Sequence, residues 1–336
     1  MAIAGRRGGE AAAGGQRVSP APGAGGSGGP PCVCRAAPAG LVARVASFWQ
    51  VALARLCRAP ARSRELQRRL DSAIAGGEFC FHYQGKFDTA QLRLVGLEAL
   101  LRWNHPRHGL VYPNEFIGLA EQTGAIAALG NWGIDAACRQ LAQWRAQGLP
   151  LVPVAVNISA RQLCQPQLPD FVLGCLRRHA IPACLLELEV TESCCIDDMA
   201  QAAQGLRQLR ALGLAISLDD YGTGHSGLSH VRLLPIHTIK IDRSFIHDLG
   251  SNGSSGRDAV IVASTLVLAR GLGLQALAEG VENGEQLAQL RRLGCPQVQG
   301  FYLHRPAPAD EVAALLSAGL VTVPKHGAMR HGADAQ

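Results

Sequence analysis

The sequence predicts an α/β fold: a (β/α)8 barrel whose first strand runs antiparallel to its neighbours. Short apolar runs rich in β-branched residues recur eight times in the roughly 240 residues after Gly77. Helical stretches separate most of these runs, and polar residues return at the downstream end of one run after another. A doubly wound open sheet is the competing fold, but no GxGxxG turn follows an early strand.

The eight runs give the expected strands. These are Phe79–Phe87, Leu94–Trp103, Pro153–Ser159, Leu185–Thr191, Leu214–Asp220, Thr238–Asp242, Leu274–Gly280 and Val298–Leu303. Only six residues, Asp88–Arg93, join the first two, which is too few for a parallel crossover. We therefore expect the first strand to be antiparallel to the second.

Helices are expected between the later strands, where apolar residues recur at helical spacing. They are Pro113–Thr123, Asn131–Ala146, Leu168–His179, Asp198–Leu212, Ala259–Gly271, Glu285–Leu293 and Ala309–Ala318, with a shorter one at Ser226–Leu234. Upstream of the barrel, Leu66, Leu70 and Ile74 continue a helical spacing that the pair Gly76 and Gly77 ends.

Four segments are expected along the chain. Residues 1–40 hold 11 Gly and 5 Pro and are expected to be a disordered tail. Residues 41–64 form a connector helix or linker, residues 65–318 the barrel, and residues 319–336 a flexible C-terminal tail. A basic helix over residues 41–58 that rests on a membrane surface is the weaker alternative for the connector.

Composition excludes several classes of protein. Hydrophobic residues make up 48% of the chain and charged residues 17%, a balance typical of a globular core. Residues 1–78 carry 11 basic and 4 acidic side chains, and the rest carry 21 basic and 22 acidic ones. The net charge of +6 therefore belongs to the N-terminal segment, and no nucleic-acid surface is expected on the barrel.

Cysteine usage and hydropathy indicate the compartment. The 11 cysteines are odd in number and show no CxxC spacing, which favours free thiols in a reducing cytosol over a disulfide framework. No apolar run is long enough to span a membrane, and the first residues lack the apolar core of a secretory signal. A cytoplasmic location is expected.

Polar side chains collect where the expected strands end. They are Glu98, Arg102, Asn157, Ser159, Glu189, Glu192, Asp219, Asp220, Lys240, Asp242, Glu279, Glu282 and Gln299. The carboxyl ends of parallel barrel strands meet at one rim, which is where the active sites of such barrels lie. One charged residue at a strand end is an ordinary solvated boundary, but its recurrence on successive strands indicates a site.

The acidic members of this set predict a divalent metal site. Five carboxylates, at Glu98, Glu189, Asp219, Asp220 and Glu279, cannot all ionise in a small space without positive charge among them. Oxygen ligands of this kind, with the amide of Asn157, suit Mg²⁺ or Mn²⁺ better than zinc. The adjacent pair Asp219 and Asp220 could contact two ions, an arrangement used in phosphodiester hydrolysis, and Lys240 would add fixed positive charge.

At these residues the sequence resembles the EAL-domain family of cyclic-di-GMP phosphodiesterases. The resemblance runs from about Glu65 to Leu316. It is carried by GLEALLRW, PNEFIGLAE, VNIS, ELEVTES, DDYGTGHSGLS, KIDRSFI, AEGVE and QGFYLHRP, in this order. Two departures occur: Gly85 follows Tyr83 and Gln84 where the family usually has Tyr-Gln-Pro, and His225 lies where Tyr-Ser-Ser is commoner.

The resemblance implies a role for each matched residue. Glu98, Asn157, Glu189 and Asp219 would hold one divalent ion, and Asp219, Asp220 and Glu279 a second. Lys240 would position or polarise the attacking water, Glu279 would help to deprotonate it, and Gln299 would hydrogen-bond in the surrounding network. Gln84, Leu101 and Arg102 would contact the dinucleotide. Glu192 would anchor the loop Tyr221–Ser229, which couples metal binding to a subunit interface.

The implied reaction hydrolyses one phosphodiester bond of cyclic-di-GMP to give linear pGpG. The resemblance implies that this reaction requires Mg²⁺ or Mn²⁺, as two ions per site, and calcium is expected to inhibit it. A homodimer is also implied. Two other functions stay open: a barrel that binds cyclic-di-GMP or a protein partner without hydrolysis, and a carbohydrate or small-molecule hydrolase, which would keep only a carboxylate pair.

Overall fold

The computed structural model describes residues 61–191, 199–223, 231–250 and 256–319. The chain divides into two units, Met1–Leu56 and Cys57–Gln336, and the described residues all belong to the second. The expected tail at residues 1–40, most of the connector at 41–64, residues 320–336, Glu192 and His225 lie outside them. Residues 61–75 are helical and lead into the barrel.

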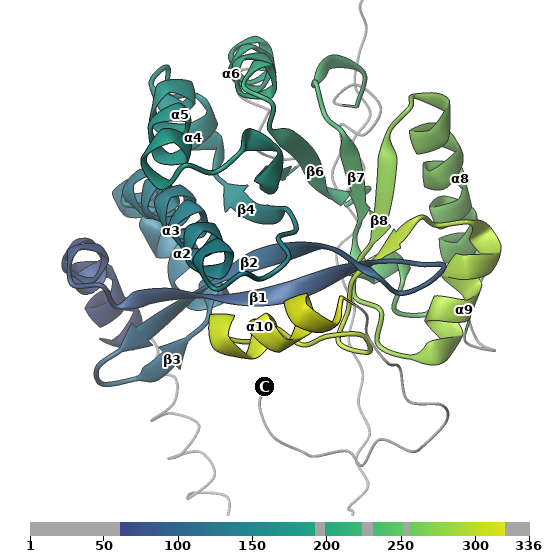
Figure 1. Cartoon of the computed structure of the whole chain (residues 1–336), viewed down its shortest axis with the longest axis horizontal. Helices are drawn as coiled ribbons and strands as arrows, with labels where there is room; N and C mark the ends of the chain where they lie inside the picture. Colours follow the sequence, from purple (N-terminus) through teal and green to yellow (C-terminus); the bar gives the residue numbers. More distant parts are fainter. Residues whose placement is uncertain (1–60, 192–198, 224–230, 251–255, 320–336) are drawn as a thin grey trace, which may run out of the picture. The chain divides into compact units, whose positions relative to one another are not determined.

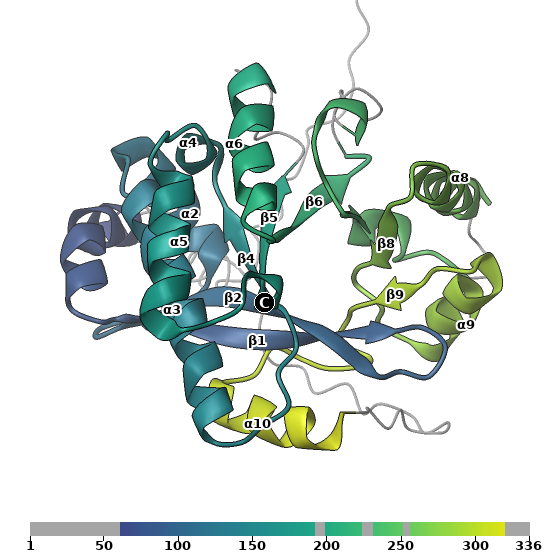
Figure 2. The same ribbon diagram turned by 45° about the horizontal axis from the view of Figure 1, so that its top comes forward.

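Eight strands close into a barrel, as the sequence predicts. Its strands are β1 (Phe79–Asp88), β2 (Leu94–His105), β4 (Val154–Ile158), β5 (Leu186–Thr191), β6 (Ala215–Tyr221), β7 (Thr238–Ile241), β8 (Gln275–Ala278) and β9 (Gln297–Val298). They follow the order β1-β9-β8-β7-β6-β5-β4-β2, and pairing of β1 with β2 closes the ring (Figures 1 and 2). A short strand that the sequence analysis missed, β3 (Gly109–Val111), pairs with the outer end of β2.

The first strand is antiparallel to both of its neighbours, which confirms the expectation from the short first connection. β1 pairs with β2 from Phe79–Trp103 to Phe87–Leu94, and with β9 at Phe87 and Asp88. The other barrel strands pair in parallel, from β2 to β4 and onward to β9.

Helices cover the outside of the barrel. They are α2 (Pro113–Thr123), α3 (Ile126–Ala146), α4 (Ala160–Leu163), α5 (Leu168–His179), α6 (Met199–Ala211), α8 (Arg257–Gly271), α9 (Gly284–Leu293) and α10 (Ala309–Ala318), with 3-10 turns η1 (Ala183–Leu185) and η3 (Arg243–Phe245). Figures 1 and 2 both show α10 lying along β1. Among the described helices, none combines the length and the apolar character that crossing a bilayer requires.

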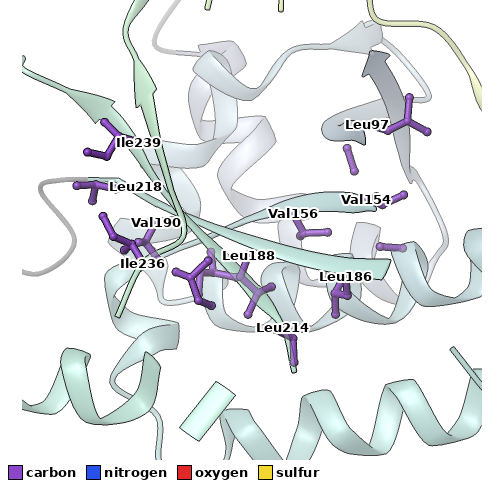
Figure 3. Packing of buried hydrophobic residues seen from close by; sticks show 14 of the residues in the cluster. Leu97, Val154, Val156, Leu186, Leu188, Val190, Leu214, Leu218, Ile236 and Ile239 are labelled. Carbon is purple, nitrogen blue, oxygen red and sulfur yellow. The ribbon is translucent and has the colours of Figure 1, made fainter. Parts of the chain in front are cut away.

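The packed core lies between the strands and these helices. Side chains alternate along each strand, so Leu186, Leu188 and Val190 of β5 point outward and join the outward residues of the strands beside it. Figure 3 shows this apolar layer, with Val154, Val156 and Leu218 in it. The same alternation turns the intervening residues toward the barrel interior.

Two glycines explain where the expected elements were wrong. The last strand was expected at Val298–Leu303 but ends at Val298, because the chain turns at Gly300, whose missing side chain leaves room for the backbone of Val281. The helix expected from Asn131 begins at Ile126 instead. Gly130 lies inside this helix, where it serves packing instead of ending the helix: an added Cβ there would lie 1.9 Å from Oε1 of Gln162.

Substitution of Gly300 tests this account of the last turn. A Cβ at position 300 would lie 2.1–2.6 Å from backbone atoms of Val281, which cannot move aside as a side chain can. We expect Gly300→Ala to lower the free energy of unfolding by at least about 2 kcal/mol, measured by urea denaturation followed by circular dichroism. Gly118→Ala in α2 is the control: no atom lies within 4 Å of its added Cβ, and a gain of about 0.5–1 kcal/mol is expected. Equal stability of the two variants would contradict the steric argument.

Candidate active site

A buried lysine lies at the centre of the acidic side chains. Lys240 is the third of the four residues of β7 and is 1% exposed. Its Nζ lies 2.7 Å from Oε1 of Glu279, 2.8 Å from Oε2 of Glu189, 3.1 Å from Oδ2 of Asp219 and 3.7 Å from Oε2 of Glu98. Four carboxyl groups from four different strands or strand ends therefore meet at one ammonium group, as the sequence predicts for this rim.

Burial and neighbouring charge separate the acidities of these groups. Burial raises the pKa of Glu279 to about 8, and Asp219, Glu98 and Glu189 add to the rise while Lys240 opposes it. The pKa values of Glu98 and Asp219 are also raised, first of all by burial. Glu189 differs, because Lys240 and Lys86 overcome the effect of burial and lower its pKa to about 2. Glu189 is thus the carboxylate that stays ionised, and its neighbours need further positive charge to do the same.

An irregularity in β6 brings two consecutive aspartates to the same side. In a regular strand, neighbouring side chains point to opposite faces. Asp220 has a φ of 54°, in the left-handed region, and the pairing with β7 shifts register between Leu218 and Tyr221. As a result, carboxyl oxygens of Asp219, Asp220 and Glu279 lie within 4.8 Å of one another. This group of oxygens is suited to a divalent cation.

Amide side chains hold the carboxylate of Glu98 from two sides. Nε2 of Gln299 donates to Oε2 of Glu98 at 2.6 Å and to Oε1 of Gln84 at 3.0 Å. Nδ2 of Asn157 donates to Oε1 of Glu98 at 3.0 Å. Gln299 keeps one buried oxygen, Oε1, with no hydrogen-bond partner among the described residues. A buried acceptor of this kind is suited to a hydrogen bond from a water molecule.

A second buried lysine lies deeper in the barrel, and the sequence analysis did not single it out. Nζ of Lys86 lies 2.7 Å from Oε1 of Glu189 and 3.1 Å from Oε2 of Glu187. The hydroxyl of Ser217 donates to Oε1 of Glu187. Lys86, Glu187 and Ser217 each lie two residues from a site residue of the same strand, so their side chains also point into the barrel. In the sequence, a lysine within the mainly apolar run FCFHYQGKF is the signal that could have revealed Lys86.

The mouth of the barrel opens into a cavity of about 300 Å³. Gln84, Arg102 and Gln299 line it together with Glu98 and Glu279. Arg102 is 7% exposed, its guanidinium lies 5.0 Å from the ring centroid of Tyr112, and its Nε is a buried donor without a partner in the described structure.

Leu101, another expected substrate contact, lies on the opposite face of β2. It lines a second, mainly apolar cavity of about 300 Å³ between the barrel wall and the helices α2 and α3. The two cavities have Leu100 in common. The side chain of Leu101 therefore lines a different cavity from the side chains of Gln84 and Arg102.

Other residues of the predicted rim serve local structure. Ser159 caps α4 by accepting from the backbone of Gln162, and Asp242 caps η3 by accepting from Ser244. Glu282 lines the cavity at the barrel mouth. Glu192, the expected anchor of the loop Tyr221–Ser229, and most of that loop lie outside the described residues.

Glu65, His105 and His108 form another group with metal-ligand spacing, away from the barrel mouth. However, Nδ1 of His105 accepts the backbone N–H groups of Arg107 and His108, at 3.2 and 3.3 Å. Glu65 pairs with Arg107 at 3.1 Å and with His108 at 3.3 Å. These contacts join the helix at residues 61–75 to the hairpin of β2 and β3. They occupy Nδ1 of His105, whereas its Nε2 is buried without a hydrogen-bond partner among the described residues.

Comparison with known proteins identifies the family. The sequence profile of the EAL domain matches residues 67–306. The chain belongs to the EAL domain family. This confirms the resemblance seen in the sequence motifs, and the matched range covers every described residue of the site.

Relatives of this EAL domain include proteins of known name. The bifunctional diguanylate cyclase/cyclic di-GMP phosphodiesterase MucR of Pseudomonas aeruginosa is 43% identical over 250 residues, which are 74% of this chain and 36% of MucR. The cyclic di-GMP phosphodiesterase NbdA of the same organism is 40% identical over 254 residues, 76% of this chain and 32% of NbdA. The chain therefore spans about a third of the length of these relatives.

Solved structures agree with the EAL fold. The phosphodiesterase of MucR in complex with c-di-GMP superposes with a TM-score of 0.69 at 43% identity, covering 74% of this chain and 99% of that one. The EAL enzyme Bd1971, in a form with cAMP and cyclic-di-GMP bound, gives a TM-score of 0.71 at 31% identity, covering 81% of this chain and 75% of that one.

Removal of the deeper lysine tests the electrostatics of the barrel interior. Lys86→Met leaves Glu187 and Glu189 without one ammonium partner, so we expect the free energy of unfolding in urea to fall by about 3–5 kcal/mol. Adding Glu187→Gln to this variant removes one unpaired charge and should recover part of the loss. Arg139→Met breaks an exposed ion pair with Asp135 and should cost no more than about 0.5 kcal/mol. If Lys86→Met lowers the free energy of unfolding no more than Arg139→Met does, the role of Lys86 as the partner of Glu187 and Glu189 is refuted.

Proposed function

We propose that this EAL domain hydrolyses one phosphodiester bond of cyclic-di-GMP, with divalent cations, to give linear pGpG. The observation that carries the proposal is the meeting of Glu98, Glu189, Asp219 and Glu279 at Lys240, in a chain whose relatives are named cyclic-di-GMP phosphodiesterases. Water is the nucleophile: its oxygen forms a bond to phosphorus, and the bond from phosphorus to one ribose oxygen breaks.

The residues at the barrel mouth fit divalent cations. The available donors are oxygens, as Mg²⁺ and Mn²⁺ prefer, and the unpartnered Oε1 of Gln299 is suited to a water molecule beside them. Glu98, Asn157, Glu189 and Asp219 would hold one ion, and Asp219, Asp220 and Glu279 the other. Bound cations would supply positive charge to the phosphate oxygens and so lower the barrier to attack.

The charges of the barrel interior support two such ions. Lys86 and Lys240 face six carboxyl groups, those of Glu98, Glu187, Glu189, Asp219, Asp220 and Glu279. With all six ionised, the carboxylates outnumber the two ammonium groups, and divalent cations would offset part of this negative charge. The raised pKa values of Glu98, Asp219 and Glu279 express the same excess of negative charge.

Residues of this chain would prepare the water and receive its proton. Lys240 donates to several carboxylates at once, which fixes its ammonium group beside the position of attack. Glu279, whose Oε1 lies 2.7 Å from Nζ of Lys240, would accept the proton of the water as a general base. Gln299 would hold the water through its free oxygen, and the proton would pass on to the departing ribose oxygen.

Gln84 and Arg102 would orient the dinucleotide in the cavity at the mouth. Arg102 has a buried donor, Nε, ready for a phosphate oxygen, and its stacking on Tyr112 restrains the guanidinium plane. Leu101 would contribute to a second subsite, in the apolar cavity beside it.

Binding without hydrolysis is the second candidate function. A receptor would not need the metal-binding residues, because only hydrolysis depends on the cations. Each metal-ligand and catalytic position that the resemblance assigns is occupied here by a residue of the required chemistry, so hydrolysis is favoured.

We also infer a homodimer, from an exposed apolar face on α8. Val260 is 64% exposed, Val267 67% and Ile261 39%, and the first two lie seven residues apart on one face of the helix. A large exposed apolar face on a helix is typical of a protein interface. The implied subunit interface of the family adjoins the loop that follows β6.

An assay of purified protein tests the proposed activity. With cyclic-di-GMP and Mg²⁺ or Mn²⁺, we expect pGpG to accumulate, as measured by liquid chromatography. Calcium added at equal concentration should inhibit, since it accepts looser geometry than Mg²⁺. Glu98→Gln removes a charged ligand and should lower kcat by about 100-fold or more.

Glu285→Gln, at an exposed position in the first turn of α9, is the matched control and should keep wild-type kcat. Saturable binding of cyclic-di-GMP without turnover, in excess Mg²⁺ and in excess Mn²⁺, would decide for the receptor. Wild-type kcat in Glu98→Gln would refute its role as a ligand.

A charge on the exposed face of α8 tests the dimer. Val267→Glu should raise the dimer dissociation constant by about tenfold or more, because the interface would have to bury an unpaired carboxylate. Gln208→Glu adds the same charge on the exposed side of α6 and should leave the dimer intact. Sedimentation velocity over a range of concentrations measures both, and an unchanged dimer in Val267→Glu would exclude this face.

A further inference from the structure

The seam between β1 and β9, like that between β8 and β9, has only two paired residues on each strand. β9 pairs with Phe87 and Asp88 of β1 and then ends. The chain detours through Gln299 and Gly300 at the site and returns to β1 at Ala307. There the N–H of Tyr83 donates to the carbonyl of Ala307 at 2.7 Å, and the N–H of Ala307 donates back at 3.0 Å. Position 85 lies between these two pairings.

A histidine side chain fills the gap. Nδ1 of His304 accepts the N–H of Gly85 at 3.2 Å, in the place where a neighbouring strand would offer a carbonyl. The carbonyl of the same residue accepts from Nε2 of Gln84 at 2.9 Å. His304 thus contacts two consecutive residues of β1, one through its ring and one through its backbone.

Position 85 is also closely packed against its own sheet, with no space for a side chain. A Cβ there would lie 2.6 Å from Cζ of Phe87 and 3.2 Å from Cδ1 of Leu94. Phe87 is fully buried. Proline would meet the same obstruction and would also lack the N–H that His304 accepts.

The contact fixes an amide that lines the active-site cavity. Gln84 is held at both ends, because its Nε2 donates to His304 and its Oε1 accepts from Gln299. Gln299 in turn donates to Glu98. We infer that His304 is a positioning residue, whose neutral ring holds β1 at Gly85 and so keeps Gln84 oriented toward the dinucleotide; this role rests on the proposed function.

The contact requires an unprotonated Nδ1. Burial lowers the pKa of His304, and Glu311 of α10 is the charged group that acts against this. Because the folded protein favours the neutral ring, the contact is complete at the ordinary histidine pKa of about 6.5 and above it, and is lost as the pH falls through the lowered pKa of His304. A proton on Nδ1 of His304 would bring its N–H against the N–H of Gly85 and remove the acceptor.

Two substitutions at position 304 separate the ring nitrogen from mere bulk. His304→Ala removes the acceptor, whereas His304→Asn offers its Oδ1 near the place of Nδ1 and cannot be protonated. Loss of one hydrogen bond predicts a rise in KM for cyclic-di-GMP of about twofold to tenfold in His304→Ala, with kcat changed less. His304→Asn should restore KM, and its KM should rise less than that of the wild type between pH 7.5 and 5.5. The exposed His247→Asn is the control and should follow the wild type.

Hydrogen–deuterium exchange at the amide of Gly85 gives a readout that does not depend on activity. It should be faster in His304→Ala, at the wild-type rate in His304→Asn, and faster in the wild type at pH 5.5 after correction for intrinsic exchange. Wild-type exchange and KM in His304→Ala would overturn the assignment, as would equal defects in both variants. An inactive wild type would count against the proposed function alone, because the exchange measurement would still test the contact.

Discussion

Charged side chains inside a closed barrel can find partners only among themselves. The alternation of each strand sends every second residue inward, and the outward positions are already committed to the apolar layer under the helices. The inward residues near the carboxyl ends are mostly acids, so each depends on the two ammonium groups that share the space. Lys240 serves the mouth and Lys86 the layer below it, and Glu189 belongs to both, with one oxygen on each lysine.

The sequence predicts the closed barrel and its antiparallel start because both follow from local patterns: β-branched runs, helical spacing and one short connection. It also predicts which residues gather at Lys240, since strand ends of a parallel barrel must converge. The role of Lys86 depends on a contact with Glu187, 101 residues away, which no local pattern reveals. The early end of β9 depends on Gly300 pressing against Val281, and the apolar residues that follow it have the pattern of a strand.

Adjacent aspartates illustrate the same limit. Their order in the sequence suggests a shared site, but a regular strand would direct them to opposite faces. Only the left-handed backbone at Asp220 and the shifted register with β7 bring them together beside Glu279. Gly85 is a similar case. From the sequence alone, a glycine suggests a flexible backbone. In the structure it packs closely against Phe87, and its N–H donates to Nδ1 of His304.

Lys86 and Lys240 determine how the barrel would respond to the loss of one acidic side chain. Because internal ammonium groups already offset part of the acidic charge, the polypeptide has a well-packed interior before any cation arrives. A substitution that removed one carboxyl group at the mouth would therefore leave the contacts of Lys86 with Glu187 and Glu189 in place. The architecture of the barrel depends on its interior lysines and its apolar layer more than on any single acidic residue at the mouth.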